Sequence, residues 1–83
     1  MPKVRATVEQ AIIRDLNKHI ESLKNRAVIC RKLAEKFKAS GLQGMAEREY
    51  ERARRLESAL QELQGVKKEI LQIFNIKEAE EDG

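Results

Sequence analysis

Apolar residues recur every seven positions along the first half of the chain, in two series that lie three positions apart. The first series is Ile13, Ile20, Ala27 and Ala34, and the second is Leu16, Leu23, Cys30 and Phe37. This heptad spacing places both series on one stripe of an α-helix. Neither Gly nor Pro occurs between Thr7 and Ser40, and Thr7-Val8-Glu9-Gln10 has the form of a capping box. The pattern predicts a helix over about residues 7–40, with Thr7 as its N-cap.

The second half of the chain carries a similar apolar stripe. Its members, at spacings of three and four, are Tyr50, Ala53, Leu56, Leu60, Leu63, Ile70 and Phe74, with Lys67 as the one polar entry. Between the two stripes, Ser40-Gly41-Leu42-Gln43-Gly44 supplies the small residues that end a helix and form a tight turn. We therefore expect a second helix over about residues 45–75.

The two stripes match each other when the chain is folded at this turn. In seven layers the position numbers of facing residues add to 86 or 87, as for Phe37 with Tyr50 and Ala34 with Ala53. The fold class predicted is all-α, a long antiparallel two-helix hairpin with the shallow packing angle of coiled coils. The small Ala34–Ala53 layer lies near the turn and the large Ile13–Phe74 layer lies far from it, so we expect the arms to splay away from the turn.

This interpretation divides the chain into a flexible N-terminus (1–6), a helical hairpin domain (7–76) and an acidic disordered tail (77–83). Gly65 gives an alternative, because Gln64-Gly65 could end the second helix. Residues 66–76 would then form a third helix that folds back, and the protein would be a three-helix monomer. We favour the continuous helix, because the constant-sum pairing continues past Gly65 and one helical Gly costs only about 1 kcal/mol relative to Ala.

Further apolar residues lie beside the stripe that the hairpin buries. The candidate interface residues are Val8, Ile12, Ile29, Leu33, Val66 and Ile73. A two-helix hairpin would leave this second strip in water, and exposed apolar patches of several hundred Å² usually mark an interface. We therefore predict a homodimer in which two hairpins form a four-helix bundle.

Residues 30–56 also carry a local motif. The motif reads Leu33-Ala34-x-x-Phe37, then Gly41, then Ala46-x-x-x-Tyr50-x-x-Ala53-x-x-Leu56. It resembles a single tetratricopeptide (TPR) repeat, in which small residues lie where two helices touch and aromatic residues fill the space beside them. The resemblance implies a helical hairpin with a protein-binding surface and no catalysis.

Composition excludes several classes of site. The 83 residues include one Cys and one His, so the chain cannot form an internal disulfide, and Cys30 with His19 cannot provide four zinc ligands. No Gly-rich phosphate loop is present, and a two-helix hairpin offers little concavity for a substrate. We therefore expect no enzyme activity, no metal and no cofactor. The chain shows neither an apolar signal core nor a stretch of about 18 apolar residues, which favours a cytoplasmic location without a membrane span.

The charge pattern leaves a second function open. Four of the 14 acidic residues lie in the last six positions, so residues 1–77 carry 17 basic against ten acidic side chains, a net +7. The candidate phosphate-binding residues are Lys24, Arg31, Arg48, Arg52 and Arg55. Helical ion pairs, such as Arg31 with Glu35 and Arg52 with Glu49, would instead make these arginines part of an ordinary solvated surface.

Two hypotheses follow. The first is a non-enzymatic interaction and assembly module that self-associates and docks an acidic or helical protein partner. The alternative is a small basic nucleic-acid-binding regulatory protein directed at RNA or DNA phosphates, for which four-helix hairpin dimers of the plasmid-copy-control (Rop) type are an analogy at the level of the fold.

Overall fold

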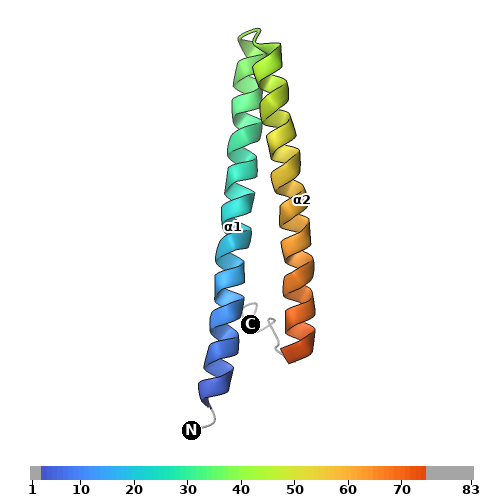
Figure 1. Cartoon of the computed structure of the whole chain (residues 1–83). Coiled ribbons are helices and arrows are strands. Elements are labelled where there is room, and N and C mark those ends of the chain that lie inside the picture. The colour runs from blue at the N-terminus through green and yellow to red at the C-terminus, as the bar shows by residue number, and fades with distance from the viewer. Residues whose placement is uncertain (1–2, 75–83) are drawn as a thin grey trace, which may run out of the picture.

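Two long helices make up the fold of this protein. The computed structural model describes residues 3–74, with side chains from Val8 onward. Helices α1 (Lys3–Ala39) and α2 (Gln43–Phe74) run antiparallel along their lengths in a hairpin that measures 61 × 20 × 19 Å (Figure 1). The predicted all-α antiparallel hairpin is thereby confirmed. The acidic tail predicted over 77–83 lies outside the described residues.

The start of α1 differs from the prediction. The helix begins at Lys3, so Thr7 lies inside it rather than at its cap, and residues 3–6, expected to be flexible, have helical backbone. Lys3-Val4-Arg5-Ala6 contains no Gly, and Pro2, which precedes it, is compatible with the first turn of a helix. A capping sequence marks the start of a helix only where the residues before it cannot adopt helical backbone. Residues 3–6 can adopt it, so the helix starts at Lys3.

The turn is a Schellman motif centred on Gly41, which has a φ of 80°. The Leu42 amide donates to the Phe37 carbonyl at 2.8 Å, and the Gly41 amide donates to the Lys38 carbonyl at 3.0 Å. These two bonds satisfy carbonyls that the end of α1 would otherwise leave unpaired. Lys36 and Lys38 in the last turn also complement the negative end of the helix dipole. Three residues, 40–42, therefore suffice to reverse the chain.

Helix α2 is longer at its start than predicted and is continuous. It begins at Gln43, which places Gly44 in its first turn rather than in the loop, and it passes through Gly65 without a break. The three-helix alternative is therefore wrong. Leu63 and Ile70, on either side of Gly65, are both half-buried in the seam, and this packing compensates for the low helix propensity of one Gly.

The predicted seam is the core, except that Ala46 is also buried, about one turn before the predicted start of the second stripe at Tyr50. The buried side chains of the described residues are Ile13, Ile20, Ala27, Cys30, Ala34, Ala46 and Ala53. Two cross-helix hydrogen-bonded pairs fix the register independently: Arg31 bonds Glu57, and Tyr50 bonds Glu35. Their position numbers add to 88 and 85, on either side of the predicted 86–87. The antiparallel register is thus the one that the heptads indicate.

Packing differs between the two ends of the hairpin. In the turn half (residues 27–56) Ala34 and Ala53 are 0% exposed, because small side chains let the backbones approach. In the open half (residues 8–26 and 57–74) every seam residue of α2, from Leu60 to Phe74, is only half-buried. The two ribbons lie further apart toward the open end (Figure 1).

Candidate functional site

Most of the large exposed apolar residues outside the seam lie on one side of the hairpin, the exceptions being Val28 of α1 and Leu42 of the turn. In α1 the positions that flank the seam on this side are Ile12, His19, Arg26 and Leu33, and in α2 they are Met45, Arg52, Ala59, Val66 and Ile73. One hollow of about 320 Å³ is lined by Arg26, Ile29 and Leu33 of α1 together with Arg52 of α2, which shows that the two rows border the same side. Heptad spacing carries both rows along the hairpin.

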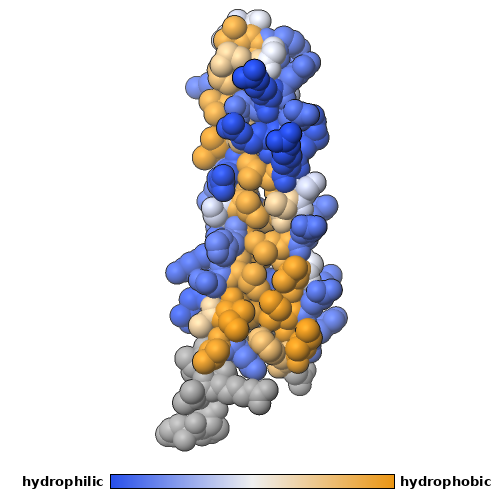
Figure 2. Space-filling view, viewed as in Figure 1, coloured by the Kyte–Doolittle hydropathy of each residue, from blue (hydrophilic) through white to orange (hydrophobic). Residues whose placement is uncertain are grey.

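We call this side the apolar face, defined by Val8, Ile12, Ile29, Leu33, Met45, Val66 and Ile73. All seven side chains are exposed, from 38% for Ile12 to 76% for Ile73. Apolar side chains gather over both helices in the open half, whereas polar side chains cover the middle of the turn half (Figure 2). The structure brings the six candidate interface residues onto this one face and adds Met45. Met45 could have been found from its seven-residue spacing to Arg52, Ala59, Val66 and Ile73.

The opposite side of the hairpin is polar and tied together across the seam. The Arg31 guanidinium donates two hydrogen bonds to the Glu57 carboxylate, at 2.6 and 2.8 Å. These bonds hold the pKa of the Glu57 carboxyl below its ordinary value. The Tyr50 hydroxyl donates to the Glu35 carboxylate, and this bond raises the pKa of the Tyr50 phenol. The predicted Arg31–Glu35 pair is therefore wrong, because each residue has a partner on the other helix.

A small polar cluster interrupts the apolar face in the turn half. Glu49 is half-buried, and its Oε2 lies 3.7 Å from an Arg52 Nη1 atom, which confirms the predicted Glu49–Arg52 pair. The other oxygen, Oε1, is buried without a hydrogen-bond partner among the described residues. Burial raises the pKa of the neighbouring Cys30 thiol, and the hydrogen bond to the Glu49 carboxylate adds to this effect. Cys30 is therefore a protonated, inert member of the seam at neutral pH.

The five candidate phosphate-binding residues do not share a surface. Lys24 and Arg31 lie on the polar side, where Lys24 lines a hollow with Gln64 and Lys68 of α2. Arg52 lines the hollow on the apolar side. Arg48, four positions before Arg52, lines a hollow with Tyr50 and Arg54, and Arg55, three positions after Arg52, lines the hollow on the outer surface of α2. Moreover, Arg31 and Arg52 already pair with Glu57 and Glu49.

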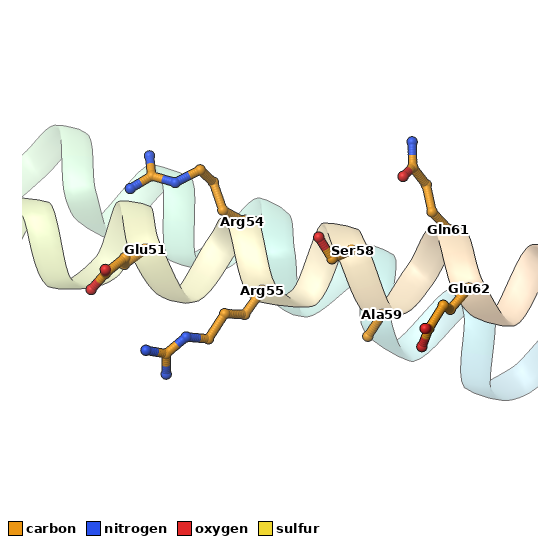
Figure 3. Close-up of a pocket in the computed structure, with 7 residues that line it drawn as sticks. All are labelled: Glu51, Arg54, Arg55, Ser58, Ala59, Gln61 and Glu62. Atoms are coloured by element: carbon orange, nitrogen blue, oxygen red, sulfur yellow. The ribbon is translucent and has the colours of Figure 1, made fainter.

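A further hollow lies along the outer surface of α2. Its lining residues, Glu51, Arg54, Arg55, Ser58, Ala59, Gln61 and Glu62, all come from this one helix. Their side chains spread away from one another rather than converging on a common point (Figure 3). The surface between them therefore lacks the convergent polar groups that fix a small ligand.

The described residues contain no group of three or more His, Cys, Asp and Glu side chains placed to hold a metal ion. Neither α1 nor α2, within residues 3–74, is long and apolar enough to cross a bilayer. The most developed feature of the surface is thus the apolar face.

A comparison of the chain with protein-family models, with curated proteins and with solved structures finds no match. The TPR resemblance of residues 30–56 therefore stays a prediction from the residues alone.

Proposed function

We propose that this chain is a non-enzymatic helical assembly module that acts by self-association. Two hairpins would pack through their apolar faces into a four-helix bundle, and the dimer would be closed by a two-fold axis. The observation that carries the proposal is that seven of the nine large exposed apolar side chains of the described residues lie on one side of both helices: Val8, Ile12, Ile29, Leu33, Met45, Val66 and Ile73. Scattered apolar residues are normal on a protein surface, but a contiguous face is typical of an interface.

The energetics support a partner of about the same size. Burial is worth about 25 cal/mol per Å², so covering several hundred Å² on each of two copies supplies on the order of 10 kcal/mol before the cost of association. A second copy of the hairpin carries the same apolar face, so the two faces match in length and width. The cross-helix bonds of Arg31 and Tyr50 lie on the opposite side and would remain undisturbed.

The test compares two adjacent residues of α1 with nearly equal exposure. Ile29 is 55% exposed and belongs to the apolar face, whereas Val28 is 51% exposed and lies about 100° further around the helix, outside the face. Ile29→Asp should convert the dimer to monomer in sedimentation equilibrium, because it places a charge in the contact. Val28→Asp should leave the dimer unchanged.

Circular dichroism of both variants checks that the helices persist. A dimeric Ile29→Asp variant, or equal disruption by Val28→Asp, would contradict the proposal. A wild-type chain that is monomeric and helical at high concentration would also contradict the proposal.

The exposed arginines of α2 support a second candidate, phosphate-directed binding of nucleic acid. Arg48, Arg54 and Arg55 are exposed, and Figure 3 shows Arg54 and Arg55 extending away from the helix. Binding through such residues would be led by phosphates and would weaken steeply with salt. A salt titration with generic RNA and duplex DNA tests it, and lack of retention at low salt removes it.

A further inference from the structure

The α1 half of the apolar face contains a row of exposed residues at alternating spacings of four and three. From the N-terminal end the row begins Val8, Ile12, Asp15 and His19. It continues with Ser22, Arg26, Ile29 and Leu33. The first four are two apolar residues, an acid and a polar residue. The last four are a polar residue, a base and two apolar residues, so the row reversed has the same chemistry with its charges exchanged.

This self-complementarity is what a two-fold interface requires, since each residue of one copy meets a different residue of the other. The symmetrical spacing by itself is a property of every heptad row. The matched chemistry is specific to this row. Apolar residues face apolar residues, and Asp15 faces Arg26, in only one register.

We propose that the second copy docks with its α1 antiparallel to α1 and its turn at the opposite end of the bundle. In this register Val8 faces Leu33 of the second copy, Ile12 faces Ile29, and Asp15 faces Arg26. The proposal rests on the proposed self-association and adds its orientation and register. It also covers nearly the full length of α1, because Lys3 of one copy then lies level with Lys38 of the other.

Other registers of the same orientation fit worse. Sliding one copy by a heptad in one direction places Asp15 opposite Leu33 and His19 opposite Ile29. Sliding it the other way places Val8 opposite Arg26 and Ile12 opposite Ser22. Each shift buries a charged group against an apolar one without a partner, which is unfavourable.

The α2 helices fit the same register. Because facing residues of α1 and α2 add to about 87, a sum of 41 along α1 fixes a sum of about 133 along α2. Val66 then lies beside Val66 of the second copy, and Ala59 lies beside Ile73. Glu62 and Glu69 approach each other as like charges, but both belong to the outer row, where water and salt screen them.

The opposite orientation, with both turns at one end, is disfavoured by charge. It would stack α1 on α2 of the second copy and place Ile29 and Leu33, which already share a hollow with Arg52 of their own chain, beside the Arg52–Arg55 segment of the second copy as well. It would also gather Arg26, Arg48, Arg52 and Arg55 of both copies at the same level. The orientation that we propose separates these arginines to the two ends of the bundle, which avoids the repulsion.

A charge exchange tests the register. Asp15 and Arg26 are exposed and lie 11 positions apart on one helix, too far for contact within a chain. Asp15→Arg and Arg26→Asp should each weaken dimerisation roughly fivefold, because each change opposes two like charges twice per dimer. The double variant D15R/R26D should return to within about twofold of wild type. Additive weakening in the double variant would overturn the register.

Spin labels test the orientation. With Cys30→Ala removing the native thiol, a label on Ser40→Cys marks the turn of each copy. The proposal predicts a separation that approaches the hairpin length of 61 Å. A separation of roughly 20 Å, the width of a bundle, would overturn the orientation while leaving self-association intact. Absence of a dimer in sedimentation of the same sample would overturn the proposed function itself, and with it this inference.

Discussion

The turn half and the open half of the hairpin are built from the same heptad pattern but bury different side chains. In the turn half, alanines at the seam bring the helices together, and the seam closes around Ala34, Ala46 and Ala53. In the open half, Ile13 and Ile20 of α1 are buried, but the larger seam residues of α2, such as Leu60 and Phe74, hold the helices apart and stay half-buried. The comparison teaches that one pattern can give two kinds of packing: small residues close the seam, and large ones leave part of their apolar surface exposed.

The largest expected effect on stability comes from placing a large side chain where the seam of the turn half has a small one. Ala53→Leu adds three carbons at a site that is 0% exposed, and overpacking of this kind costs about 1–3 kcal/mol. Ala59→Leu adds the same atoms at an exposed position of α2 in the row of Met45, Val66 and Ile73. It should leave stability unchanged or, through the proposed self-association, raise it. Urea unfolding of both variants at one protein concentration measures the difference.

Equal destabilisation by the two leucines would contradict the distinction between a closed and an open half. The fixed protein concentration is the control, because the proposed self-association would make apparent stability depend on protein concentration.

Two glycines, Gly41 in the turn and Gly65 in the open half, allow the backbones of the two regions to be compared. A Cβ at Gly41 or at Gly65 would meet nothing within 4 Å, so neither substitution causes a clash. Gly41 has a φ of 80°, and Gly41→Ala should therefore cost about 1–2 kcal/mol in the turn. Gly65 lies within α2, and Gly65→Ala should stabilise the open half by about 0.5–1 kcal/mol.

Thermal unfolding of each alanine variant beside wild type measures both effects. A stabilising Gly41→Ala would show that the turn does not depend on a left-handed residue. A destabilising Gly65→Ala would show that the open half uses Gly65 as a bend.

Much of this architecture follows from residue spacing alone. The seam, the register and the six exposed apolar positions depend on helical periodicity, which the sequence displays directly. The start of α1 does not follow from periodicity. Thr7 can act as an N-cap or lie inside a helix, and which of the two occurs depends on whether residues 3–6 are helical.

The polar contacts were harder to predict for a different reason. Arg31 and Glu35 have the spacing of a pair on one helix, but each side chain also reaches α2, where Glu57 and Tyr50 are better partners. Likewise, Lys24 and Arg52 belong to one basic set by composition and to opposite sides of the hairpin by geometry. Residue spacing predicts which face of one helix a side chain occupies. Which faces of α1 and α2 come together depends on how the two helices pack.

The smallest effect concerns the one tyrosine, on the polar side of the turn half. The chain has one Tyr and no Trp, so phenol ionisation can be followed by absorbance without interference. The hydrogen bond to Glu35 raises the pKa of Tyr50 above its ordinary value of about 10. A group whose pKa is raised by folding adds stability below its unfolded pKa and loses that contribution as the pH rises through the folded pKa.

Glu35→Gln should therefore move the Tyr50 titration midpoint down toward its value in the unfolded chain, and stability should fall less steeply above pH 10 in the variant than in wild type. Glu47→Gln is the matched control, since Glu47 is an exposed carboxylate of α2, the helix that carries Tyr50, and the Tyr50 hydroxyl bonds Glu35 instead. An unchanged midpoint in Glu35→Gln would mean that Tyr50 is held by the seam alone. The turn half would then close without the polar bond across it, and small side chains would be sufficient cause for its difference from the open half.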